Sequence, residues 1–109
     1  MKVLFSPDVR LYFRELSELL IEEEYFGFED AAIQYVRELV FDIRDTLDNR
    51  LKRPAPAYFA CYGKGLYYAV FKRNNNTQWY VFFETYVKEK TYVVTFIGNN
   101  HTVAQYIRE

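Results

Sequence analysis

The sequence predicts an α+β domain in which an N-terminal strand and a helical hairpin pack on a three- to four-stranded antiparallel sheet, followed by a short C-terminal helical tail. Before residue 50, apolar residues recur every three to four positions, which is the period of one helix face. After residue 57 they form short runs rich in aromatic and β-branched residues, as strands do, separated by short polar turns. A length of 109 residues predicts a single domain over 1–109.

The composition narrows the class of protein. Half of the residues are hydrophobic and a fifth are aromatic, which excludes a disordered chain. No apolar run approaches the roughly 18 residues of a membrane span, and the N-terminus becomes charged too soon for a signal peptide. The one cysteine, Cys61, excludes an internal disulfide and cannot by itself build a thiolate metal site. We therefore expect a cytoplasmic protein with no membrane partner.

The charge is unevenly distributed along the chain. Residues 1–51 carry six Lys/Arg against twelve Asp/Glu, a net charge of −6, and residues 52–109 carry eight against three, a net charge of +5. A basic sheet half indicates an anionic partner on that side. The alternative is that opposite charges simply cover different faces of the domain.

The first half of the chain is expected to be a strand and two helices. Lys2–Phe5 is the strand, and Ser6 and Pro7 then favour a helix start, because serine is a common N-cap and proline suits the first helical position. A break at Tyr25–Phe28 precedes a second helix that begins at Glu29, and this short connection predicts an antiparallel hairpin. The predicted apolar stripes are Val9, Phe13, Leu16, Leu19 and Leu20, then Ala32, Tyr35, Val36, Leu39, Ile43 and Leu47.

The second half is expected to form the sheet. Pro54 and Pro56 end the second helix in a basic loop. Three strands are predicted and a fourth is a candidate: Leu66–Lys72, Thr77–Tyr86 and Thr91–Ile97, with Ala57–Tyr62 as the candidate. Four-residue turns join Leu66–Lys72 to Thr77–Tyr86 and Thr77–Tyr86 to Thr91–Ile97. These three strands should therefore form antiparallel hairpins with Thr77–Tyr86 in the interior.

Two residues of the tail are candidates for chemistry. His101 is the only histidine, and an imidazole can exchange protons near neutral pH, as general acid–base catalysis requires. The alternative is a surface histidine that caps the tail helix, a role that Asn100 or Thr102 could fill equally well. Tyr106 lies five residues further on, and its phenol could donate a proton or stack on a base.

Four cations are candidates for binding phosphates: Lys52, Arg53, Lys72 and Arg73. If they converge on one concave surface, exposed tyrosine or tryptophan rings beside them could stack bases. The alternative is ordinary solvated loop charge. The sequence contains no phosphate-binding loop, no dinucleotide motif, no paired metal ligands and no serine nucleophile with a base, so we expect neither a metal nor a cofactor.

The order of these elements resembles the RelE/ParE superfamily, the small toxins of bacterial type II toxin–antitoxin pairs. The resemblance covers nearly the whole chain. It rests on the opening strand and helical hairpin, the basic loop at Lys52 and Arg53, the aromatic strand Trp79–Phe83, and the ending from Ile97 through His101 to Tyr106. The family usually has an arginine in the central strand near Tyr80, and Arg73 is the candidate substitute.

The resemblance implies a function. The RelE branch consists of metal-independent ribonucleases that cleave mRNA on the ribosome. Resemblance to this branch implies that His101 serves as acid or base and that Tyr106 is the tail tyrosine. It also implies that Lys52 and Arg53 hold phosphates. It also implies a cognate antitoxin as partner. The sequence leaves open an alternative, a non-catalytic interaction module that is either a gyrase-poisoning ParE-like protein or a degenerate toxin that only binds an antitoxin.

Overall fold

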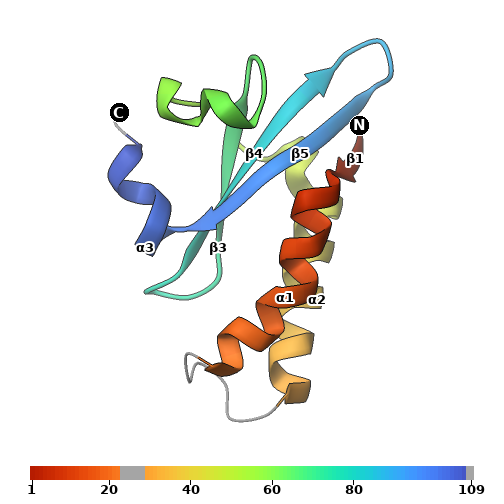
Figure 1. The fold of residues 1–109 in the computed structure, drawn as a ribbon. Helices are drawn as coiled ribbons and strands as arrows, with labels where there is room; N and C mark the ends of the chain where they lie inside the picture. The colour runs from red at the N-terminus through yellow and green to blue at the C-terminus, as the bar shows by residue number, and fades with distance from the viewer. Residues whose placement is uncertain (23–28, 108–109) are drawn as a thin grey trace.

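The computed structural model describes residues 1–22 and 29–107, and the predicted helix break at Tyr25–Phe28 lies outside them. The chain forms an α+β fold (Figure 1). Its elements are β1 (Lys2–Phe5), α1 (Pro7–Glu22), α2 (Glu29–Thr46), the 3₁₀ helix η1 (Leu47–Asn49), β2 (Arg53–Pro54), the 3₁₀ helix η2 (Ala57–Tyr62), β3 (Tyr67–Lys72), β4 (Gln78–Tyr86), β5 (Thr91–Asn99), α3 (Asn100–Val103) and the 3₁₀ helix η3 (Ala104–Tyr106). Neither of the long helices is apolar enough over its described residues to cross a membrane.

The sheet has five strands in the order β1-β5-β4-β3-β2. The β3–β4 and β4–β5 hairpins are antiparallel and β4 is an interior strand, so these predictions are confirmed. The sheet is mixed rather than antiparallel throughout, because β1 pairs in parallel with β5. Parallel pairing is possible here because the helical hairpin provides the long crossover that it needs. The fifth strand is β2, a two-residue edge strand in the basic loop.

The start of α1 is set by Ser6 and Pro7, as predicted. The Ser6 hydroxyl accepts a hydrogen bond from the Val9 amide at 3.3 Å, which caps the helix. The Ser6 amide donates to the Val94 carbonyl at 2.9 Å, at the end of the β1–β5 pairing. The chain therefore leaves the sheet and enters the helix within one residue.

The helical hairpin covers one face of the sheet (Figure 1). The predicted helix stripes are confirmed except at two positions: Leu19 is exposed and Tyr35 is only partly buried. From the sheet, Ala69, Phe71, Trp79, Val81 and Phe83 point into this core. Their spacing of two in β3 and β4 is that of side chains on one face of a strand.

The opposite face carries a second, smaller core under η2 and the tail. Its buried members are Phe59, Leu66, Tyr68, Phe82 and Val103. The prediction that Ala57–Tyr62 is a fourth strand is wrong, because this segment is the 3₁₀ helix η2. With three residues per turn, Phe59 and Tyr62 lie on the same side and both meet the sheet, Phe59 against Phe82 at 4.3 Å and Tyr62 against Phe96 at 3.9 Å between ring centroids.

The tail is held on the sheet by a close approach at Gly98. A Cβ built on Gly98 would lie 2.4 Å from the Val103 Cγ2, well inside van der Waals contact. Val103 is buried in the second core, and it belongs to the same short helix as His101. Glycine at residue 98 thus lets α3 pack directly against the end of β5.

We predict that Gly98→Ala lowers the free energy of unfolding by about 1–3 kcal/mol, because the new methyl group must displace Val103. Urea denaturation followed by circular dichroism measures the change. The double variant Gly98→Ala/Val103→Ala removes the clashing methyl groups and should lose less stability than the sum of the two single variants. Strict additivity of the two losses would contradict the close-packing explanation.

Candidate functional site

His101 lies in the first turn of α3, directly beyond the interior strand β5. The cap of this helix is Asn99, whose side-chain oxygen accepts hydrogen bonds from the amides of His101 at 3.0 Å and Thr102 at 3.2 Å. Asn100 instead joins the tail to the β3–β4 hairpin, since its side chain bonds the backbone of Gln78 and Asn76. Neither His101 nor Asn100 is needed as the cap, and the His101 side chain is exposed.

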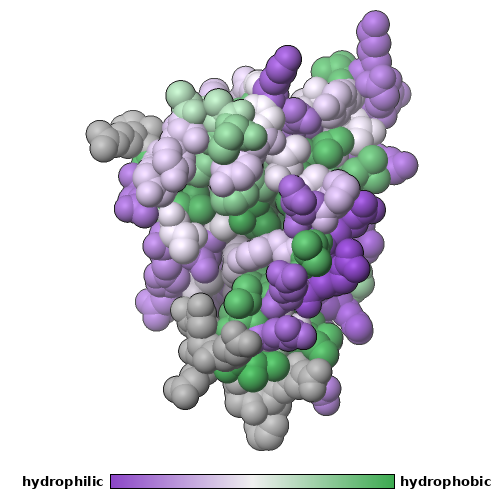
Figure 2. All heavy atoms as spheres, in the orientation of Figure 1, coloured by the Kyte–Doolittle hydropathy of each residue, from purple (hydrophilic) through white to green (hydrophobic). Residues whose placement is uncertain are grey.

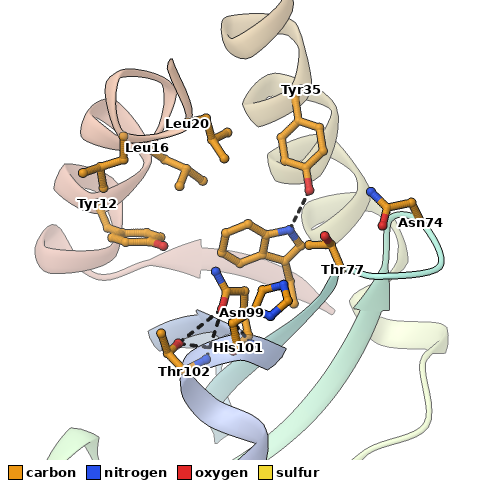
Figure 3. A pocket seen from close by; sticks show the side chains of 11 residues that line it. Tyr12, Leu16, Leu20, Tyr35, Asn74, Thr77, Asn99, His101 and Thr102 are labelled. Carbon is orange, nitrogen blue, oxygen red and sulfur yellow. Dashed lines mark hydrogen bonds between the residues drawn. The ribbon is translucent and has the colours of Figure 1, made fainter. Parts of the chain in front are cut away.

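His101 lines a cavity of about 340 Å³ between the end of the sheet and the helical hairpin. Figure 3 shows side chains converging on it from α1, α2, the β3–β4 hairpin and the tail. We call this the His101 cavity, and its lining residues are Tyr12, Leu16, Leu19, Leu20, Tyr35, Asn74, Thr77, Trp79, Asn99, His101 and Thr102. The buried Trp79 indole is fixed by a hydrogen bond from Nε1 to the Tyr35 hydroxyl at 2.9 Å.

The His101 cavity combines apolar and neutral polar groups. Leucine side chains and aromatic rings form one part, and amides, hydroxyls and one imidazole form the other. Among the described residues that line it there is no carboxylate, lysine or arginine. Such a cavity can hold a flat, uncharged ring, with amide and hydroxyl groups available to its edge. The imidazole is the group placed to exchange a proton with it.

Tyr106 is directed elsewhere. Its ring stacks on Tyr58 of η2 with a centroid distance of 3.7 Å and an angle of 4° between the planes. A hydrogen bond with the Tyr106 hydroxyl raises the pKa of the Tyr58 phenol above its usual value. Tyr106 is not among the residues that line the His101 cavity, so the structure does not bring the two predicted catalytic residues together.

Three of the four predicted phosphate-binding residues lie near the two ends of β3, Arg53 beside its start and Lys72 and Arg73 at its end. Arg53 pairs with Tyr68 in the sheet register, Lys72 is the last residue of β3, and Arg73 follows it. Arg50 joins them, because its guanidinium donates to the Val70 carbonyl at 3.3 Å and lies 4.2 Å from the Phe71 ring centroid. We call Arg50, Arg53, Lys72 and Arg73 the basic strip.

One carboxylate, that of Asp42, pairs with two of the four cations of the basic strip. Asp42 of α2 accepts hydrogen bonds from Arg50 at 3.2 Å and also forms an ion pair with Arg73. Arg50 and Asp42 were not among the residues predicted from the sequence. Their spacing could have indicated the contact, since Asp42, Thr46 and Arg50 follow one another at intervals of four and form one hydrogen-bonded row. With Asp42 included, the strip still carries a net charge of +3, from four cations and one anion.

Lys52 lies at the other end of the sheet. Its ammonium donates to the carbonyls of Asp48 and Arg50, both at 2.9 Å, and lies 5.4 Å from the centroid of the Tyr92 ring. Tyr92 pairs with Thr85 near the end of β4, whereas Lys72 pairs with Gln78 at its start. Lys52 and Arg73 therefore do not line one concave surface, and the prediction that they do is not supported by their positions.

The basic strip and the His101 cavity meet at the β3–β4 hairpin. Arg73 stands at the base of this hairpin, and the next residue, Asn74, lines the cavity together with Thr77. The Arg73 amide donates to the Thr77 carbonyl at 2.9 Å, which closes the turn. Arg73 is thus the cation next to the cavity, whereas Lys72 alternates with Phe71 and points to the other face of the sheet.

No group of three or more His, Cys, Asp or Glu residues within the described chain is arranged to hold a metal ion. Comparison of the chain with protein-family models, with curated proteins and with solved structures yields no match.

We predict that Asp42→Asn lowers the free energy of unfolding by about 1–3 kcal/mol, because two partly buried guanidiniums lose their shared anion. Urea denaturation at constant ionic strength measures this. The matched control is Asp45→Asn, on the same helix, whose side chain is 66% exposed and pairs with the neighbouring Arg44 at 3.5 Å. The control should change stability by less than about 0.5 kcal/mol. Equal losses of unfolding free energy in the two variants would show that the ion pairs of Asp42 with Arg50 and Arg73 do not stabilise the fold.

Proposed function

We propose that this protein is a toxin-type protein that acts on single-stranded RNA and belongs to a type II toxin–antitoxin pair. In this proposal the His101 cavity takes one unstacked base, and the basic strip holds the neighbouring phosphates. The observation that carries it is the junction at the β3–β4 hairpin, where Arg73 stands next to a neutral, partly aromatic cavity with an exposed imidazole.

The cavity suits a base in size and in chemistry. A volume of about 340 Å³ is at the small end of the range for ligand pockets, so it suits a single ring system rather than a large cofactor. Recognition of single-stranded RNA commonly uses bases that are splayed out, stacked on aromatic rings and hydrogen-bonded at their edges. Here Tyr12 supplies a ring, and Asn74, Thr77 and Asn99 supply edge groups.

The reaction that fits this arrangement is transfer of a phosphoryl group within the RNA. The ribose 2′-hydroxyl attacks the adjacent phosphorus, the bond to the 5′-oxygen breaks, and the products are a 2′,3′-cyclic phosphate and a 5′-hydroxyl. One proton leaves the 2′-oxygen and one is delivered to the 5′-oxygen. His101 acts in one of these two transfers, as acid or as base. The reaction needs neither a metal nor a cofactor.

The alternative is a non-catalytic interaction module, which could bind RNA or an antitoxin without cleavage. A specific observation favours it: the described residues lining the His101 cavity include no carboxylate, lysine or arginine, and the ionisable groups there besides the imidazole are the phenols of Tyr12 and Tyr35. Tyr106, the second group expected from the sequence, is stacked on Tyr58. Cleavage and binding therefore have to be measured separately.

We predict that His101→Ala reduces cleavage of mRNA on translating ribosomes by roughly 10²–10⁴-fold, the usual share of one acid–base group. RNA binding should change little, because the cavity keeps its rings and amides. The matched control is Gln105→Ala, an exposed position on the same tail that does not line the cavity, and it should cleave like the wild type.

The outcomes separate the two functions. A wild type that cleaves RNA, with His101→Ala equally active, would remove His101 from the mechanism. A wild type that binds RNA without cutting it would establish the non-catalytic module. A wild type that neither binds RNA nor slows growth when expressed would refute the proposed function.

We predict that Lys72→Gln weakens RNA binding and reduces the slope of log K against log salt concentration by roughly 0.7, the value for one phosphate contact on a single strand. Lys72 is exposed on the basic strip, so the substitution should leave the fold intact. The matched control is Lys88→Gln in the β4–β5 turn, at the opposite end of β4. Fluorescence anisotropy with a labelled oligoribonucleotide measures both variants. Identical slopes for the two variants would show that the basic strip is not the RNA path.

A further inference from the structure

Strand β5 is paired along its whole length on only one side. β1 has four residues and matches Thr91 to Val94, whereas β5 continues to Asn99. Within the described chain, the strand that pairs with β5 beyond Val94 is β4 alone. From Thr95 onward, the edge of β5 that pairs with β1 at residues 91–94 therefore has no neighbouring strand within the described chain.

A groove follows this unpaired side. Its volume is about 440 Å³, and four consecutive strand residues, Thr95 to Gly98, line it. Because alternate side chains of a strand point to opposite faces, consecutive residues can line one cavity only where it runs along the strand edge. Val9 and Tyr12 wall it from the helical layer, and Tyr62 from the layer of η2. We call this the edge groove.

The middle of the molecular face on this side is less hydrophilic than its margins. Figure 2 shows neutral and hydrophobic atoms along the centre of the view, with strongly hydrophilic atoms on either side. The Thr95 hydroxyl is buried and has no hydrogen-bond partner within the described chain. Buried hydroxyls without a partner are uncommon, and this one lies on the edge groove.

We propose that the edge groove binds an extended peptide segment of a partner protein, which adds to β5 as a strand in line with β1. Strand addition uses main-chain hydrogen bonds for affinity and side-chain pockets for specificity. Four residues of strand extend about 13 Å, so the segment needs only about four residues to cover Thr95 to Gly98.

The walls of the edge groove define the chemistry of this segment. Apolar groups stand on both faces of the sheet edge, Val9 and Tyr12 on one and Phe96 and Tyr62 on the other. The segment therefore carries β-branched or other apolar residues on both of its faces. Asp8 stands at the groove and makes no ion pair within the described chain, so a lysine or arginine belongs at the matching position.

This inference goes beyond the proposed function and does not depend on it. The edge groove and the His101 cavity share Tyr12 and Thr102 as a common wall, but the groove contains neither His101 nor any residue of the basic strip. A protein without RNA activity would still present the unpaired side of β5.

The test uses a synthetic peptide, acetyl-TVKVTV-amide, titrated into the full-length ¹⁵N-labelled chain. We expect the amide resonances of Thr95 to Gly98 to shift and their hydrogen exchange to slow. The control is the same peptide with alternate backbone nitrogens methylated, which keeps every side chain but removes the N–H donors that face the sheet. The methylated peptide should cause no shift.

Two variants test the charge preference. Asp8→Lys should weaken binding of the lysine-containing peptide about three- to fivefold, the size expected for one exposed ion pair. The matched control is Asp30→Lys, which also replaces the second residue of a helix and should leave binding unchanged.

Several results would overturn the proposal. They are equal binding of the plain and methylated peptides, shifts confined to β1 or β3, and the absence of any shift at the highest soluble peptide concentration. Shifts of Thr95 to Gly98 caused by hexauridylate but not by the peptide would assign the groove to nucleic acid instead. Equal weakening by Asp8→Lys and Asp30→Lys would remove the preference for a basic segment.

Discussion

The sharp exit of the chain from β1 at Ser6 and Pro7 is the constraint on which the rest of the structure depends. The Ser6 amide completes the pairing with β5, while its hydroxyl already caps α1. Proline has no amide hydrogen to give to a sheet but is well suited to the start of a helix. β1 therefore stops while β5 continues for five more residues. The extra length of β5 carries α3 and His101 beyond the end of β1, and it leaves both the His101 cavity and the edge groove beside α1.

The high aromatic content is explained by the two cores. A sheet covered by helices on one face needs one apolar side chain in two, yet β4 is apolar at almost every position from Trp79 to Phe83. The alternate residues Tyr80 and Phe82 serve the second core, which η2 and the tail cover. Because η2 is one short helix, a few large rings have to fill this layer, and the stacked pairs of Phe59 with Phe82 and Tyr62 with Phe96 do so. The same packing fixes the place of α3 through Val103.

Local patterns were enough to predict the helices, the two hairpins and the start of α1, because each depends on periodicity, turn length or a cap signal close in sequence. They were insufficient where contacts distant in sequence decide the structure. The short apolar and aromatic run Ala57–Tyr62 fits a strand, whereas the rings of β4 and β5 beneath it favour the 3₁₀ helix. The parallel partner of β1 lies about ninety residues away. Likewise, Arg73 looked like a free cation because Asp42, its partner, is 31 residues earlier.

The separation of His101 from Tyr106 follows from helix geometry. The α-helix α3 turns the side-chain direction by about 100° per residue and the 3₁₀ helix η3 by about 120°, so the five steps from His101 to Tyr106 turn it through one full revolution and roughly 140° to 240° more. Two side chains at that spacing point to different sides of the tail. His101 consequently faces the helical hairpin, and Tyr106 faces η2, where its ring stacks on that of Tyr58. A second proton-transfer group at the end of β5 therefore has to come from elsewhere than Tyr106, and the phenols of Tyr12 and Tyr35 line the same cavity as the imidazole. Of its two predicted catalytic residues, the tail therefore contributes only the His101 imidazole to this cavity, and Tyr106 does not act together with it.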